Sequence, residues 1–241
     1  YNSYNPPYCN GNPALIYFVG RGVTGGWGGE VPTYDLVNEY EVKDPRKVHT
    51  ILSHGDIFPK KDGNEEVHDY TGYDNFTKLQ SRKHYVDHFR RPDAGLKQTD
   101  WSYYHIRYAD VLLMYAEAEV RKTGTVPSVA AINAVNQVRN RAGLANLPAV
   151  ATNTKDAFLD AILIERGHEL FYEGNRKIDL IRFNKYAQEM YKAKGVMPTH
   201  QYMPIPNYAV KQAVSYGKEL KQTWERPGWA EDKSKAQQNI N

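Results

Sequence analysis

The segment from Ile106 to Gly124 constrains the fold more than any other part of the chain, because its apolar residues repeat with the period of a helix. Steps of three and four, which place side chains on one helical face, separate Ile106, Ala109, Leu113, Ala116 and Val120. A second stripe beside it holds Tyr108, Leu112 and Tyr115. We therefore expect a helix that is packed on two sides and ends at Gly124, where a left-handed residue is required.

Three more helices are expected beyond Gly124. The first follows Pro127, turns Ile132, Val135, Val138 and Ala142 inward, and ends at Gly143. The second is capped by Thr154, aligns Leu159, Leu163, Arg166 and Leu170 on one face, and ends at Gly174. The third runs from about Lys177 to Lys194, before Gly195.

These helices pair into two hairpins in series, which is typical of tetratricopeptide stacking. The hairpins start about 50 residues apart rather than about 34, so any repeat is irregular. Prolines at 198, 204, 206 and 227 predict a mostly irregular tail over residues 197–241 that wraps the helices.

The first hundred residues have a different texture. Gly, Pro, Asn, Asp and Tyr interrupt short apolar pieces there, which predicts loops, short strands and at most short helices. The exception is a short helix over Val31–Tyr40, with Pro32 in its first turn and an end before Asp44-Pro45.

Composition excludes several classes of protein. The net charge is only +3 and no long basic run occurs, so nucleic-acid binding is not indicated. The longest apolar stretches, Ala14–Val19 and Val111–Ala116, fall short of the roughly 18 residues that a membrane-spanning helix needs. The single cysteine, Cys9, has no partner for an internal disulfide.

Three motifs invite a catalytic or ligand-binding interpretation that their context does not support. Gly20–Gly25 has the glycine spacing of a dinucleotide site, but Gly26-Trp27-Gly28-Gly29 cannot open the helix that such a site requires. His84 and His88 lack the glutamate of a zinc-protease motif, and Asp62–Glu66 lacks the glycine and distal glutamate of an EF-hand. A flexible or ligand-facing loop that presents Trp27 is favoured for the first motif, and a solvated turn for the last.

Glu165, Glu169 and Glu173 follow one another at intervals of four, so like charges share one helical face and require cations opposite them. Neighbouring segments offer arginines for an ion-pair ladder: Arg139, Arg141, Arg176 and Arg182. The alternative is a pair of carboxylates that hydrolyses a glycosidic bond. No nucleophile signature accompanies the row, so we expect no enzyme activity.

Several of these segments resemble one known family. The helix Ile106–Ala118, the stretch Asn136–Leu144 and the run Glu165–Arg182 are similar, in order, to motifs of the SusD/RagB-like outer-membrane nutrient-binding lipoproteins. Pro32–Arg46, Met203–Pro206 and Gln238-Asn239 resemble further motifs of that family. The last one departs, because Ile240-Asn241 stands where Pro-Gly is usual. The resemblance covers most of residues 20–241.

The resemblance implies a mainly α fold, with tetratricopeptide-like helical hairpins, extensive loops and few short strands. It further implies a loop-rich, ligand-facing region over 1–100 and a helical region over 101–241, together the C-terminal portion of a protein whose N-terminal half and anchor cysteine are not in this chain. The implied role is capture of an oligosaccharide at the cell surface for a TonB-dependent outer-membrane barrel, with no cofactor, although a structural calcium ion is compatible. A peptide ligand, or a purely structural helical scaffold, is the alternative.

Candidate ligand-binding residues follow from type and position in the loops. A sugar's C–H face stacks on aromatic rings, for which the chain offers Tyr17, Trp27, Tyr34, Tyr73 and Trp101. Its hydroxyls need polar partners, for which Arg21, Asp74 and Asn75 are suited.

Overall fold

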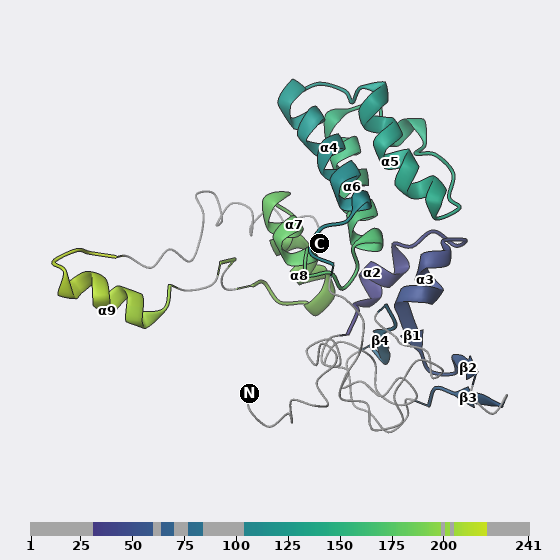
Figure 1. Cartoon of the computed structure of the whole chain (residues 1–241), viewed down its shortest axis with the longest axis horizontal. Coiled ribbons are helices and arrows are strands. Elements are labelled where there is room, and N and C mark those ends of the chain that lie inside the picture. Colours follow the sequence, from purple (N-terminus) through teal and green to yellow (C-terminus); the bar gives the residue numbers. More distant parts are fainter. Residues whose placement is uncertain are drawn as a thin grey trace, which may run out of the picture. The chain divides into compact units, whose positions relative to one another are not determined.

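The computed structural model describes residues 31–59, 64–69, 77–83, 104–198, 201–202 and 205–220. The chain forms two compact units, residues 1–176 and 177–241. The described part is mainly helical with a few short strands, which confirms the predicted fold class (Figure 1).

The first unit is built on α4 (Tyr108–Thr123), α5 (Val129–Arg141) and α6 (Lys155–Glu169). Helix α4 packs against both α5 and α6, so the predicted hairpin and the predicted two-sided packing are confirmed (Figure 1). Fully buried apolar side chains fill the space between them: Leu113, Ala116, Val120, Val135, Phe158 and Ile162. A short 3-10 helix, η4 (Ala149–Ala151), precedes α6 and packs on it.

The helix ends follow the capping signals in the sequence. Gly124 closes α4 with a φ of 71°, and Gly143 follows α5 with a φ of 77°. The Ser128 hydroxyl accepts a hydrogen bond from Ala131 N, and the Thr154 hydroxyl accepts one from Ala157 N at 3.1 Å. Each pairing satisfies a backbone N–H that has no partner inside the helix.

The expected burial of α4 was only partly right. The buried stripe is Leu113, Ala116 and Val120, whereas Ile106 is 69% exposed and Tyr108 is 70% exposed. Tyr115 on the second stripe is also exposed. The reason is geometric, since Ile106 precedes the helix and α5 and α6 cover only part of the circumference of α4.

Two predicted boundaries were wrong. Helix α6 ends at Glu169 rather than Gly174, because Leu170 caps it and Tyr172 then takes a left-handed φ of 59°. The single helix expected over 177–194 is two helices, α7 (Arg176–Arg182) and α8 (Tyr186–Lys194), separated where Asn184 takes a φ of 61°. Gly195 ends α8 as predicted.

The tail beyond residue 197 also holds a helix that the proline content did not predict. Helix α9 (Asn207–Ser215) begins directly after Pro206, a position that proline tolerates well because its missing N–H would have no partner there. None of its residues is buried.

The described residues before residue 100 form two short helices and four short strands. Helix α2 (Tyr34–Asn38) is capped by Thr33 rather than started by Pro32, and α3 (Pro45–Thr50), which was not predicted, is capped by Asp44. Strand β1 (Ile51–Ser53) pairs antiparallel with β4 (Leu79–Ser81), and β2 (Ile57–Pro59) pairs antiparallel with β3 (Glu65–Val67). Glu65 and Glu66, expected in a solvated turn, thus lie in a strand.

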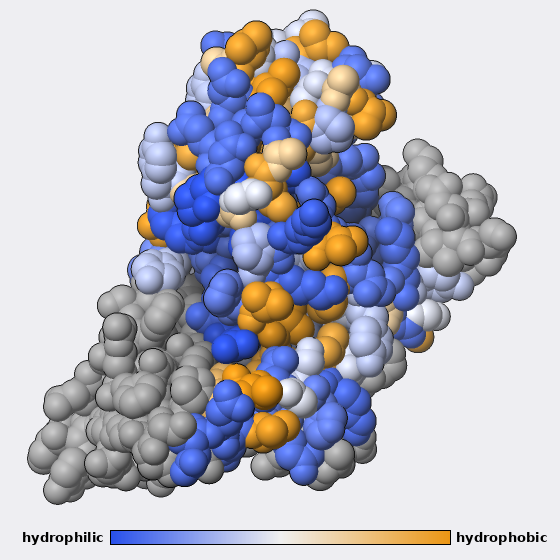
Figure 2. Space-filling view, turned by 90° about the vertical axis from the view of Figure 1, so that its right-hand side faces the viewer, coloured by the Kyte–Doolittle hydropathy of each residue, from blue (hydrophilic) through white to orange (hydrophobic). Residues whose placement is uncertain are grey.

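Polar side chains dominate the face of the molecule that Figure 2 shows, with apolar residues in smaller groups between them. No helix in the described ranges is both long enough and apolar enough to cross a bilayer.

The cap of α6 gives a direct test of the local argument. Replacing Thr154 with Ala should lower the free energy of unfolding by about 1 kcal/mol, because Ala157 N loses its acceptor. Thr154→Ser keeps the hydroxyl and should stay close to the wild type. Urea denaturation of the three proteins measures this, and equal losses in both variants would contradict the capping role.

Candidate functional site

Of the eight predicted ligand-binding residues, Tyr34 is the one that the structure describes. The others lie outside the described residues, and so do the glycine motif at 20–25 and the two histidines at 84 and 88. These predicted residues are Tyr17, Arg21, Trp27, Tyr73, Asp74, Asn75 and Trp101.

Tyr34 stands at the first position of α2 with 51% of its surface exposed. Its hydroxyl donates a 2.6 Å hydrogen bond to the carbonyl oxygen of Thr77, just before β4. This bond holds the ring in place, while its exposed part remains free to contact a ligand. Tyr34 therefore has the geometry that stacking on a sugar would need, with its hydroxyl already engaged.

Among the described residues of the first unit, the glutamates on α6 and their cations form an extended polar assembly. Glu165 and Glu169 lie on α6, and Glu173 lies just beyond its end; all three are buried. The predicted ladder is partly confirmed, because Arg139 contacts Glu165 at 3.2 Å and Arg141 contacts both oxygens of Glu169 at 2.5 Å. Arg139 also reaches the exposed Glu41.

The other two arginines expected in the ladder act elsewhere. Arg176 crosses α6 beside Gly167 and donates to the carbonyl of Leu163 at 3.0 Å. A side chain at Gly167 would place its Cβ 2.7 Å from that guanidinium, so the glycine makes room for it. Arg182 pairs with Asp179 in the second unit.

The cation at the centre of the row is Arg46 on α3, which the ladder hypothesis did not include. Its Nη1 donates to Glu165 at 2.6 Å and to Glu169 at 3.0 Å, while Nη2 contacts Asp44 at 2.7 Å. Asp44 in turn caps α3 by accepting from Arg46 N. The sequence signal for this arrangement was the run Asp-Pro-Arg, because its Asp caps α3 and its Arg is the central cation.

Two more cations enclose the far end of the row. Arg107, the residue before α4, contacts Glu169 at 2.5 Å and Glu173 at 2.9 Å, and it also donates to the Glu169 carbonyl. Lys83, after β4, contacts Glu173 at 2.5 Å and donates to the same carbonyl at 2.7 Å. The last turn of α6 is thereby tied to the start of α4 and to the strand pair. We call the set Asp44, Arg46, Lys83, Arg107, Arg139, Arg141, Glu165, Glu169 and Glu173 the α6 ion-pair cluster.

Burial and charge compete in setting the pKa values of this cluster. Burial acts to raise the pKa of Asp44, but hydrogen bonds from the side chain and backbone of Arg46 hold it below the ordinary value. Burial likewise opposes ionisation of Glu169, yet hydrogen bonds and charge from Arg107, with Arg141 and Arg46, lower its pKa. Burial outweighs the attraction of Glu173 at Lys83, so the pKa of that ammonium is lowered.

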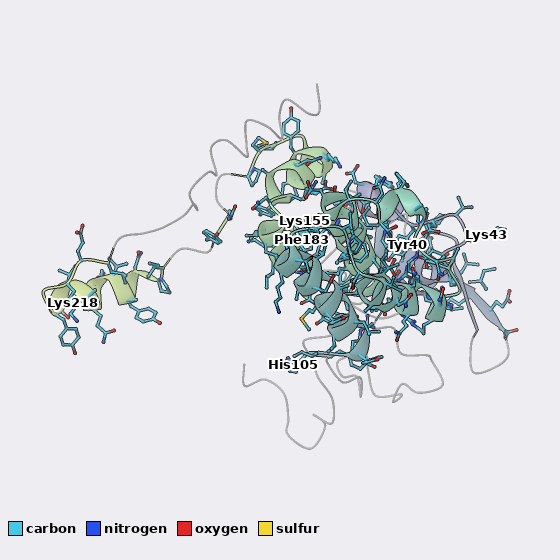
Figure 3. All side chains as sticks on the ribbon, turned by 90° about the horizontal axis from the view of Figure 1, so that it is seen from above. Tyr40, Lys43, His105, Lys155, Phe183 and Lys218 are labelled. Atoms are coloured by element: carbon cyan, nitrogen blue, oxygen red, sulfur yellow. The ribbon has the colours of Figure 1, made fainter. Side chains whose placement is uncertain are left out.

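A buried histidine lies beside the cluster. His168 stacks on Tyr40, with ring centroids 4.0 Å apart and an interplanar angle of 22°. Burial, followed by the positive charge of Arg46, lowers the pKa of His168 to about 3. Burial also raises the pKa of Tyr40 to about 12, so both rings are neutral at pH 7. Tyr40 lies among the helices, whereas Lys43 points outward (Figure 3).

A second buried ion pair joins α6 to α4. Arg166, which the helical period placed on the same face as three leucines, contacts Asp110 at 2.7 Å. Across the described ranges, no group of three His, Cys, Asp or Glu side chains could hold a metal ion.

Comparison with known proteins identifies the family. Residues 1–227 match the SusD family. The chain belongs to this family. It is 30% identical to SusD-like protein P2 of Formosa agariphila over 201 residues, which cover 75% of this chain and 37% of that protein. The chain thus spans well under half the length of this relative.

Solved structures share the fold. A laminarin-binding SusD-like protein aligns with a TM-score of 0.60 at 24% identity, over 91% of this chain and 44% of the other. A structure solved with a xylogluco-oligosaccharide aligns with a TM-score of 0.53 at 22% identity, over 73% of this chain and 35% of the other. The resemblance that the sequence motifs indicated is therefore confirmed as membership of the family and as its fold.

Replacing a buried acid of the α6 ion-pair cluster should lower the free energy of unfolding far more than replacing the exposed Glu41, which contacts the cluster from outside. Glu169→Gln should lower the free energy of unfolding by about 3 kcal/mol, because guanidinium groups from three segments lose the charge that they enclose. Glu41→Gln removes a 51% exposed partner of Arg139 and should cost less than about 1 kcal/mol. Urea denaturation at pH 7 compares the two variants, and similar losses would contradict the structural role assigned to Glu169.

Acid should weaken the fold through the same groups. The folded-state pKa values of Asp44 and Glu169 are below ordinary, so their stabilisation is present above the unfolded-state values near 4 and is lost as pH falls through the folded-state values. Asp44→Asn keeps a side-chain oxygen that can cap α3 but removes the carboxyl that titrates. The free energy of unfolding of this variant should therefore depend less steeply on pH below about 4.5 than that of the wild type. Urea denaturation between pH 2.5 and 7 tests this, and identical pH profiles would exclude the Asp44 contribution.

Proposed function

We propose that this chain, as part of a SusD-family protein, binds glycan at the cell surface and delivers oligosaccharide to a TonB-dependent outer-membrane barrel without altering it chemically. The observation that carries the proposal is the family match over nearly the whole chain. Two proteins of the same fold support the ligand class, since one is described as laminarin-binding and another was solved with a xylogluco-oligosaccharide.

The state of the α6 carboxylates favours binding over hydrolysis. A glycosidase needs one carboxylic acid with a raised pKa as proton donor and a second carboxylate facing the sugar. Here the pKa of Glu169 is lowered, and Glu165 and Glu173 are buried against cations. A row held in this way stabilises helix packing and presents no open face to a sugar.

The glycan contacts are proposed on the loops of the first hundred residues. Tyr34 offers a half-exposed ring with its hydroxyl anchored, as stacking requires. Trp27 is proposed as the main stacking residue, because its neighbours in the sequence are glycines, which have no side chain that could cover the indole. A structural calcium ion in these loops remains part of the proposal.

The experiment is calorimetric titration of the chain with soluble glycans, including laminarin and xyloglucan oligosaccharides. Binding of one glycan class should be lost or weakened about fivefold or more in Trp27→Ala and retained in part in Trp27→Phe, since stacking on an aromatic ring contributes about 1 kcal/mol or more. Tyr208→Ala, which removes an exposed aromatic on α9, is the matched control and should leave the affinity unchanged.

Three outcomes would contradict the proposal. The first is that a folded chain binds no glycan of the panel, while mass spectrometry finds peptides that copurify with it. This result would favour a peptide-binding member of the family. If the chain binds neither glycans nor peptides, a purely structural role as a helical scaffold would be favoured. Release of shorter sugars over time, abolished in Glu169→Gln while binding is retained, would establish a hydrolase.

A further inference from the structure

The contact between His168 and Tyr40 joins two parts of the first unit that are distant in sequence. Tyr40 follows α2, and its hydroxyl oxygen lies 3.2 Å from the Thr50 hydroxyl on α3 and 3.3 Å from the His168 carbonyl. The two rings are stacked, and both residues are at most 5% exposed. The segment 34–51 is therefore held to the last turn of α6 partly by the imidazole ring itself.

The surroundings of the imidazole favour its neutral form. The charged groups that act on it most strongly are Arg46 from α3, Asp44 before α3, Arg176 from the start of α7 and Arg139 from α5. Asp44 is engaged by Arg46, and Glu165 and Glu169 on the same helix as His168 are held by guanidiniums. Three cations thus oppose a proton here, and one occupied carboxylate favours it.

The ring also lacks an acceptor for a second proton. Among the described residues, Nε2 of His168 is buried and meets no hydrogen-bond partner. A protonated imidazole needs an acceptor at each ring nitrogen. Protonation in the packed state would leave a charged N–H buried without a partner, beside three guanidiniums.

We propose that the His168–Tyr40 stack is an acid-sensitive latch, in which protonation of the imidazole releases segment 34–51 from α6 while α4 and α5 stay packed. Once released, the imidazole titrates near its ordinary value of about 6.5, so opening becomes more favourable as pH falls below that value. The equilibrium constant for opening should rise roughly 20-fold between pH 7 and pH 5. Released carboxylates titrate near 4 and contribute little in this range.

Hydrogen–deuterium exchange read by mass spectrometry tests the latch on the full chain. After correction for the intrinsic pH dependence of exchange, peptides within 34–51 should lose about 20-fold in protection between pH 7 and pH 5. Peptides from α4 should lose much less. An equal loss in α4 would mean global unfolding and would overturn the proposal, as would constant protection of segment 34–51.

Variants separate the imidazole from other groups that titrate. His168→Phe keeps an aromatic ring against Tyr40 but cannot be protonated, so it should abolish the pH dependence; His168→Gln serves the same purpose if the larger ring is not accommodated. His49→Gln alters an exposed histidine of α3 within the same segment and should leave the 20-fold change intact. An unchanged pH dependence in both His168 variants would overturn the proposal.

Discussion

The buried carboxylates of α6 set the condition that the rest of the first unit must meet. Glu165 and Glu169 lie on a helix face that is otherwise used for packing, and Glu173 follows it into the interior. Removing such charges from water is unfavourable by several kcal/mol for each ion unless partners with good geometry replace the water. Folding of the unit therefore requires cations to arrive from other segments, and each segment that brings one is fixed in place by doing so.

The segments that bring the cations explain how short elements near the start of the chain are held. Helices α2 and α3 and the strand pair β1–β4 are too short to be stable alone. Arg46 anchors α3 to two glutamates, and Lys83 ties the end of β4 to Glu173 and to the backbone of Glu169. The position of Tyr34 at the start of α2 therefore depends on contacts made at α6.

Local signals predicted the helices well and the cluster only in part. Hydrophobic period and caps located α4, α5 and the start of α6, because those signals act within a few residues of one another. Arg139 and Arg141 were identified because they lie on the helix that precedes α6. Arg46 and Arg107 lie 119 and 62 residues from Glu165 and Glu169, and no spacing rule connects residues so far apart.

The errors have local causes as well. Tyr172 and Asn184 adopt left-handed backbone conformations and end helical segments although the apolar period continues beyond them. A left-handed conformation at Tyr172 is not indicated by its residue type, because aromatic residues rarely adopt positive φ. The candidate ligand-binding residues were predicted from residue type and from their place in segments without a helical period, where period and capping supply no constraint. For Tyr34, the hydrogen bond that anchors the ring could not be predicted in this way, since it joins Tyr34 to Thr77 across 43 residues of sequence.

The cluster also fixes the register of α6. Glutamates repeated every four residues could in principle slip by one turn along a row of cations, which would exchange their partners. Two features oppose such a slip. Glu173 lies beyond the helix end, so the row is not uniform, and Arg46 bridges two glutamates while its other nitrogens hold Asp44. Breaking one pair of a buried network leaves the other charge without a partner, so arrangements in which the segments exchange or lose partners are disfavoured. The ligand contact proposed for Tyr34 depends on this single arrangement, because a ring on which a sugar stacks must stay in one place.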